Sequence, residues 1–237
     1  MMKGYFQTTQ GIAKVLEVHQ VEPELRRREC RPDEVEAALC ALDLDPTRIR
    51  ARDWPAGLQG LEQAGLYSWW VDAEGAADLS AGIGATVAAG RIYAGQTGAT
   101  AWPSGQPRST TLRGRIGGNH LHGRIRGSTF RLTLAAALCG PLGLTVTAPR
   151  RLDRESERRL GEWMREHLEA AVFAFPERDA LGHLEDYLLA HLDPPLNIKG
   201  MPPTPLRRGL SELREALSRS CLGGCRAREW PQQNAGG

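Results

Sequence analysis

The chain has 237 residues, of which 41% are hydrophobic and 24% are charged, with a formal net charge of +2. It is therefore long enough for a substantial core and unlike low-complexity disordered chains. Its longest apolar run, 132–148, is broken by glycines and a proline, and the first residues lack the apolar stretch of a secretory signal, so no membrane partner is expected. Five cysteines at irregular spacing favour reduced thiols and a cytoplasmic location.

In chain order, the first predicted element is a helix that begins at Pro32, because proline suits a first turn and apolar residues then recur at helical spacing. Two strands follow at 66–71 and 90–94, with a Gly- and Ala-rich connection between them. A short helix capped by Ser109 is expected to end near Gly117 and Gly118. Later predicted elements are a helix within 127–140, an amphipathic helix within 152–171, a strand at 171–177, and helices at 179–192 and 210–220.

These elements predict an α+β fold with a small three-stranded sheet, mixed or antiparallel, flanked by helices. Three regions are expected. Residues 1–60 form a partly helical N-terminal extension, 61–200 the main domain, and 201–237 a C-terminal helix and flexible tail.

Acidic residues are absent between Asp78 and Asp153, although arginine is frequent there. The segment 79–152 holds nine arginines and carries +9, while the rest of the chain carries −7. A GC-rich genome can account for the preference for arginine over lysine, but not for the absence of carboxylates. Concentrated guanidinium groups favour a polyanion, so we expect nucleic acid as the partner. The candidate backbone contacts are Arg113, Arg124, Arg126 and Arg131.

One carboxylate is anomalous on the predicted helix 179–192. At 100° per residue, Glu185 falls inside a stripe of leucines, whereas Asp186 lies on the opposite side. A carboxylate on the core-facing side must be paired, protonated or bound to a cation. A buried Glu–Arg pair and a metal ligand therefore both stay open for Glu185.

Four short motifs in order resemble the GIY-YIG nuclease superfamily. They are "GLY" at 65–67, "IYAG" at 92–95, "TLRGRI" at 111–116 and "HLEDYLLAHLDPPLN" at 183–197. The resemblance covers about 64–200. The sequence departs from the family name at two aliphatic positions, where it has Leu66 and Ala94. The spacings between the motifs are longer than is typical, which indicates insertions.

The resemblance implies a metal-dependent endonuclease that hydrolyses DNA through a single Mg²⁺ or Mn²⁺, with RNA as an alternative substrate. The implied site residues are Tyr67, Tyr93, Arg115, His120, Glu185 as the metal ligand, and Asn197. Arg113 is a rival for the role of Arg115, and His120 follows at a spacing that looks one residue too long. Oligomeric state is not predicted.

Two hypotheses compete with an endonuclease. One is a non-catalytic nucleic-acid-binding protein that uses the arginine-rich segment 79–152. The other is a structural α+β protein in which Glu185 merely pairs with Arg115.

Overall fold

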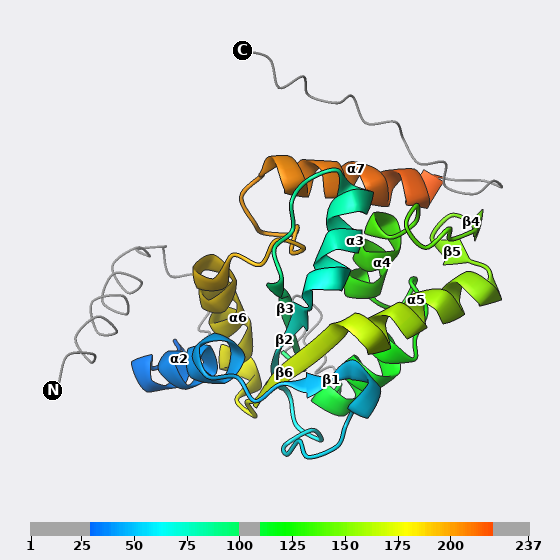
Figure 1. Cartoon of the computed structure of the whole chain (residues 1–237). Coiled ribbons are helices and arrows are strands. Elements are labelled where there is room, and N and C mark those ends of the chain that lie inside the picture. Colours follow the sequence, from blue (N-terminus) through cyan, green and yellow to red (C-terminus); the bar gives the residue numbers. More distant parts are fainter. Residues whose placement is uncertain (1–28, 100–109, 220–237) are drawn as a thin grey trace, which may run out of the picture.

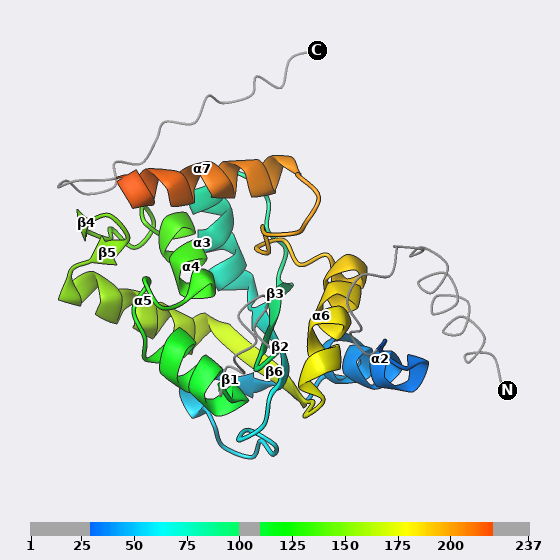
Figure 2. The same ribbon diagram turned by 180° about the vertical axis from the view of Figure 1, so that it is seen from behind.

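The structure, a computed structural model, describes residues 29–99 and 110–219. A four-stranded sheet lies between two groups of helices, as the two opposite views in Figures 1 and 2 show. Helices α2 (Pro32–Leu39) and α6 (Arg178–Leu192) cover one face. The other face carries α3 (Ala73–Ile83), α4 (Thr129–Ala137), α5 (Arg154–His167) and α7 (Pro205–Arg219).

The sheet is antiparallel throughout, with the strand order β1-β6-β2-β3. Its strands are β1 (Ile49–Arg50), β6 (Leu168–Ala174), β2 (Gly65–Val71) and β3 (Gly90–Thr97). A separate hairpin pairs β4 (Val146–Ala148) with β5 (Arg151–Leu152). The predicted α+β fold is confirmed. The short β1 adds a fourth strand, and β6 begins at Leu168 because α5 ends one residue earlier.

Strand β2 is covered on both faces, and its side chains alternate between two cores. Tyr67 and Trp69 pack on the side of α3 and α4, whereas Leu66 packs on the side of α2 and α6. Ser68 is fully buried, and its hydroxyl donates to the carbonyl of Leu42 at 3.0 Å. The strand that holds Tyr67 is therefore fixed from both sides.

Helix α3 lies where the sequence predicted only a connection. Asp72 caps it by accepting from the N–H of Gly75 at 2.7 Å, and Gly84 ends it in the left-handed conformation at φ 74°. Its internal glycines hide the helical pattern, but they are required by packing. A Cβ on Gly82 would lie 1.7 Å from the carbonyl oxygen of Ala137, so α3 can approach α4 only with glycine there.

The arginine helix also differs from the prediction. After a first turn that starts at Leu112, it continues as the π-helix η3 (Gly114–Leu121), straight through Gly117 and Gly118, where an end was predicted. Ser109, its predicted cap, lies outside the described residues. Thr111 accepts from the N–H of Gly114 at 3.1 Å instead.

Segments outside the predicted main domain take part in the core. Val35, Ala38 and Leu39 of α2, and Leu42 of the following π-helix η1 (Cys40–Leu44), pack against α6 and the sheet. Helix α7 begins at Pro205, five residues before its predicted start, and contributes buried leucines to the other core. The boundaries at residues 60 and 200 remain predictions.

Cys30 and Cys40 carry free thiols, which agrees with the expectation of reduced cysteines for these two residues. The cytoplasmic location remains a prediction. Within 29–99 and 110–219, no helix has the length and apolar character needed to cross a bilayer.

Replacing Gly65 by alanine should destabilise the protein by about 1–3 kcal/mol, because overpacking a tight site forces the backbone to move. The added Cβ would lie 2.2 Å from the carbonyl oxygen of Phe173 and 3.1 Å from the Cα of Ala174, both in the paired strand β6. Urea unfolding measures the change. Gly140→Ala is the control, since nothing lies within 4 Å of its added Cβ. Equal midpoints for the two variants would contradict this account.

Candidate active site

The hydroxyl group of Tyr67 is the point at which the predicted site residues meet. Tyr67 is 1% exposed, and its oxygen accepts from Nε of Arg115 at 3.3 Å. Nε2 of His120 lies 3.0 Å from the same oxygen. Both partners come from η3, so one helix supplies a cation and an imidazole to one buried phenol.

The π-helical winding explains the long spacing between Arg115 and His120. Residues five apart on an α-helix point about 140° away from each other. In a π-helix the backbone bonds run from i to i+5, as in the bond from His122 N–H to the Gly117 carbonyl at 3.0 Å. Residues five apart therefore share one side, and both side chains reach Tyr67.

Tyr93 and Gly95 complete this face on the neighbouring strand. The ring centroids of Tyr67 and Tyr93 are 6.5 Å apart, with the planes inclined by 25°. Gly95 pairs with Tyr67 across the strands, and a Cβ there would lie 2.9 Å from the Tyr67 hydroxyl oxygen. Any larger residue at position 95 would push the hydroxyl away from Arg115 and His120.

Ser128 contacts the far side of His120, and the sequence did not indicate this contact. Nδ1 of the fully buried His120 lies 2.6 Å from the Ser128 hydroxyl, which also accepts from the N–H of Arg131 at 3.0 Å. Burial, followed by the charges of Arg115 and Arg131, lowers the pKa of His120 well below 6.5. The imidazole is therefore neutral.

Tyr67 is a neutral phenol for a similar reason. Burial raises its pKa above 10, and the attraction of Arg115 offsets this only in part. The pKa of Tyr93 is raised as well, first by burial and then by Tyr67. Neither tyrosine is activated by its neighbours to titrate near neutral pH, so both act here as hydrogen-bonding groups.

Glu185 reaches the site from α6, on the opposite face of the sheet, beside the edge strand β3. The backbone N–H of Gln96 lies close enough to its carboxylate to lower the pKa of Glu185. Burial, followed by repulsion from Asp186, raises the pKa of Glu185 to about 7 despite the attraction of Arg115 and Lys199. No ion pair joins Glu185 to Arg115 or to any other described cation, so the simple Glu–Arg pair is not formed.

A partly buried carboxylate without a counter-ion fits a hard divalent cation. In the described part of the chain, no cluster of three or more His, Cys, Asp or Glu side chains could hold a metal. The protein would thus supply one carboxylate, and water or another oxygen ligand the remaining oxygens. This donor set suits Mg²⁺ or Mn²⁺ better than Zn²⁺, which takes several nitrogen or sulfur ligands.

Asn197, one of the site residues that the resemblance implies, holds the backbone of β3 through both of its side-chain groups. Its amide nitrogen donates to the carbonyl of Ala94 at 2.8 Å, and its oxygen accepts from the N–H of Ala94 at 3.0 Å. Both side-chain groups are used, and the side chain is buried. Asn197 therefore occupies the free edge of β3 between Tyr93 and Gly95.

The predicted nucleic-acid contacts divide into different environments. Arg131 is 2% exposed and was wrongly expected at the surface: it pairs with Glu157 and donates to the carbonyl of His120. Arg113 is half-exposed and pairs with Glu62. Arg124 and Arg126 are exposed.

Arg214 of α7 is a residue that sequence reasoning missed. It is partly buried, and it lies close enough to the Tyr93 hydroxyl and to Arg150 for electrostatic interaction. Nothing in the pattern of the predicted helix 210–220 indicated this, because α7 reaches the site only through tertiary packing on α3 and α4.

Comparison with known families agrees with this arrangement. Residues 65–216 match the family model described as the GIY-YIG catalytic domain, a range that includes Tyr67, Arg115, Glu185 and Arg214. Searches of curated proteins and of solved structures found no significant match.

The unfolding free energy should fall as the pH is lowered through about 6.5, partly because of His120. Below about pH 6.5 the unfolded state binds a proton on this residue, whereas the folded state does not because its pKa is lower. The lowered pKa therefore stabilises the fold at higher pH, and this stabilisation is lost on acidification. The variant His120→Gln lacks this contribution. Its unfolding free energy should therefore fall less between pH about 7.5 and about 5 than that of the wild type. Urea titrations across this range measure the effect.

The control is His191→Gln, at an exposed position on α6. It keeps the buried imidazole and should follow the wild-type trend. If His120→Gln lost as much stability on acidification as the wild type, His120 would not be a buried neutral imidazole.

Proposed function

This chain belongs to the family of GIY-YIG catalytic domains, which are nucleases, and we propose that it is a metal-dependent endonuclease that hydrolyses phosphodiester bonds in DNA. The observation that carries the proposal is the meeting of Arg115 and His120 at the Tyr67 hydroxyl, with an unpaired carboxylate, Glu185, close enough to interact with Arg115. Phosphodiester hydrolysis needs these parts: a positioned water, positive charge on the phosphate, and a metal ligand.

Arg115 is proposed to bind the scissile phosphate. Its guanidinium group remains charged, and its Nε–H donates to the Tyr67 hydroxyl. The other N–H groups can therefore donate to phosphate oxygens. Charge that develops on these oxygens in the transition state strengthens the same bonds. The bond to Tyr67 fixes the plane of the guanidinium group before substrate binds.

Tyr67 is proposed to orient the attacking water. The hydroxyl is held by Arg115 and His120, and its raised pKa makes it a hydrogen-bonding group and not a phenolate. The water oxygen forms the new bond to phosphorus while the bond to the 3′-oxygen breaks; the water loses a proton to solvent, and the 3′-oxygen gains one from solvent and leaves as a hydroxyl group. Mg²⁺, or Mn²⁺ in its place, would be held by Glu185 and when bound supplies positive charge that stabilises the departing oxygen.

The competing hypothesis is a non-catalytic nucleic-acid-binding protein. It shares the exposed arginines, but it does not require a buried hydroxyl, a neutral imidazole and an uncompensated carboxylate at one place. Burying these groups together destabilises the fold. Cleavage requires all of them, whereas binding alone does not.

Two substitutions should abolish cleavage without unfolding the protein. Glu185→Gln removes the metal ligand, and Arg115→Gln removes the phosphate-binding cation; each should lower kcat by about a hundredfold or more. Labelled single- and double-stranded DNA, and the matching RNA, are incubated with Mg²⁺, Mn²⁺ or EDTA. We expect cleavage of DNA that depends on the metal.

Each variant has a matched control beside it in the chain. Asp186→Asn changes the exposed carboxylate next to Glu185, and Arg113→Gln changes the rival arginine two residues before Arg115. Both should retain activity within a few-fold. Wild-type rates in Glu185→Gln would refute the proposal, and salt-sensitive binding without cleavage in any metal would favour the non-catalytic alternative.

A further inference from the structure

A second concentration of positive charge lies outside the candidate active site. Arg124, Arg126, Arg150, Arg151 and Arg154 line one cavity with a volume of about 630 Å³. We call these five residues the arginine pocket. All five are exposed, so their guanidinium groups are accessible to a ligand.

The carboxylates of this cavity are already occupied. Asp153 accepts from the N–H of Ser156 at 2.7 Å as the cap of α5. Glu157 pairs with the buried Arg131 at 3.1 Å, and its other oxygen accepts from the N–H of Ile125 at 3.2 Å. None of the five pocket arginines forms an ion pair with a carboxylate in the described part of the chain. The pocket therefore holds an excess of positive charge.

Separate parts of the chain bring these arginines together. Arg124 and Arg126 lie in the loop between η3 and α4, directly after His122. Arg150, Arg151 and Arg154 come from the β4–β5 hairpin and the first residue of α5, at the end of the molecule remote from α6 in Figures 1 and 2. No single stretch of sequence forms the pocket.

Positive charge continues from the pocket toward the candidate active site. Arg214 of α7 is close enough to interact with Arg150 on one side and with the Tyr93 hydroxyl on the other. Arg115 then follows at Tyr67, which stacks with Tyr93. A polyanion that reached from the pocket to Tyr67 would meet a cationic group at each of these places.

We propose that the arginine pocket binds the phosphate backbone of the DNA substrate at a distance from the scissile bond, so that efficient cleavage requires a substrate long enough to reach both places. This inference rests on the proposed nuclease function. Guanidinium groups suit the task because they donate two parallel bonds to phosphate, and backbone contacts raise affinity without reading sequence. A free phosphate compound shares the same chemistry, and the experiment separates the two sources.

The test compares the wild type with the triple variant Arg124→Gln, Arg126→Gln, Arg151→Gln. Binding to labelled duplexes of about 30 and about 6 base pairs is measured in EDTA, where no cleavage occurs, across a salt series. We expect the triple variant to bind the long duplex at least tenfold more weakly. Its slope of log affinity against log salt should be shallower by about 2–3, because each lost phosphate contact removes about 0.9.

The short duplex should bind the two proteins equally. In Mg²⁺, kcat/KM should fall for the long substrate and remain unchanged for the short one. Because the binding arm needs no catalysis, it tests the pocket even if the wild type cleaves nothing, and the two proposals can fail separately.

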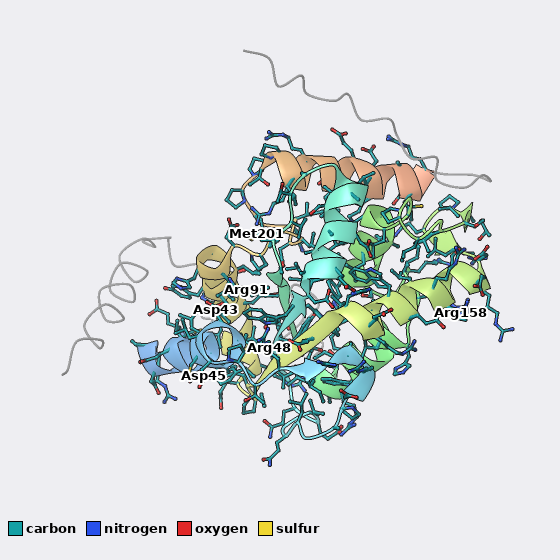
Figure 3. The ribbon with its side chains drawn as sticks, in the orientation of Figure 1. Asp43, Asp45, Arg48, Arg91, Arg158 and Met201 are labelled. Carbon is teal, nitrogen blue, oxygen red and sulfur yellow. The ribbon has the colours of Figure 1, made fainter. Side chains whose placement is uncertain are left out.

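The matched control carries the same change in net charge elsewhere: Arg52→Gln, Arg158→Gln, Arg219→Gln. These arginines are exposed and lie beside carboxylates, and Figure 3 shows the Arg158 side chain pointing outward from α5. The control should keep the wild-type affinity and slope. Equal DNA binding by the wild type and the pocket variant would overturn the proposal. So would loss of pyrophosphate binding in the pocket variant with unchanged DNA affinity, which would assign the pocket to a free phosphate ligand.

Discussion

A buried hydroxyl group needs partners, and the environment of Tyr67 is organised around this requirement. Its oxygen has Nε of Arg115 at 3.3 Å and Nε2 of His120 at 3.0 Å, both from the same short helix. An α-helix could present only one of these two side chains to the hydroxyl. The π-helical η3 presents both, at the expense of the poorer backbone geometry that makes such helices rare. Gly95 then leaves room for the hydroxyl to stay where the Arg115 and His120 side chains meet.

The support behind this arrangement runs through a buried arginine. Arg131 donates to the carbonyl of His120 and to the backbone and side chain of Glu157, so one guanidinium group connects η3, α4 and α5. Burying an ion pair is costly, but here the remaining N–H groups also find acceptors, which offsets the desolvation. The backbone N–H of Arg131 in turn helps fix Ser128 against His120. His120 is thus held through both its imidazole ring and its main-chain carbonyl.

Sequence reasoning found the parts whose signals are local. Strands were predicted at 66–71 and 90–94, where β2 and β3 lie, and the helical wheel identified Glu185 as a carboxylate among leucines. What it missed depends on contacts between distant segments. Helix α3 contains glycines because α4 and α5 pack closely on it, and a propensity argument treats the same glycines as breakers. The π-helix was visible only as a spacing that looked one residue too long, since nothing local distinguishes its winding from an irregular α-helix.

The charge pattern shows the same limit most clearly. The absence of acids in 79–152 predicted a surplus of positive charge for a nucleic-acid partner, yet carboxylates from outside the segment neutralise several of its arginines. Asp43 pairs with Arg91, Glu62 with Arg113 and Glu157 with Arg131. Among the arginines that the structure describes in this segment, those without such partners are Arg115 beside Tyr67 and four that gather in the arginine pocket, and Arg214 of α7 lies between the two places. Counting charges along the sequence therefore overestimates the electrostatic potential that a ligand meets. Ion pairs formed in the fold neutralise some arginines, and the unpaired ones lie where a phosphate backbone can bind.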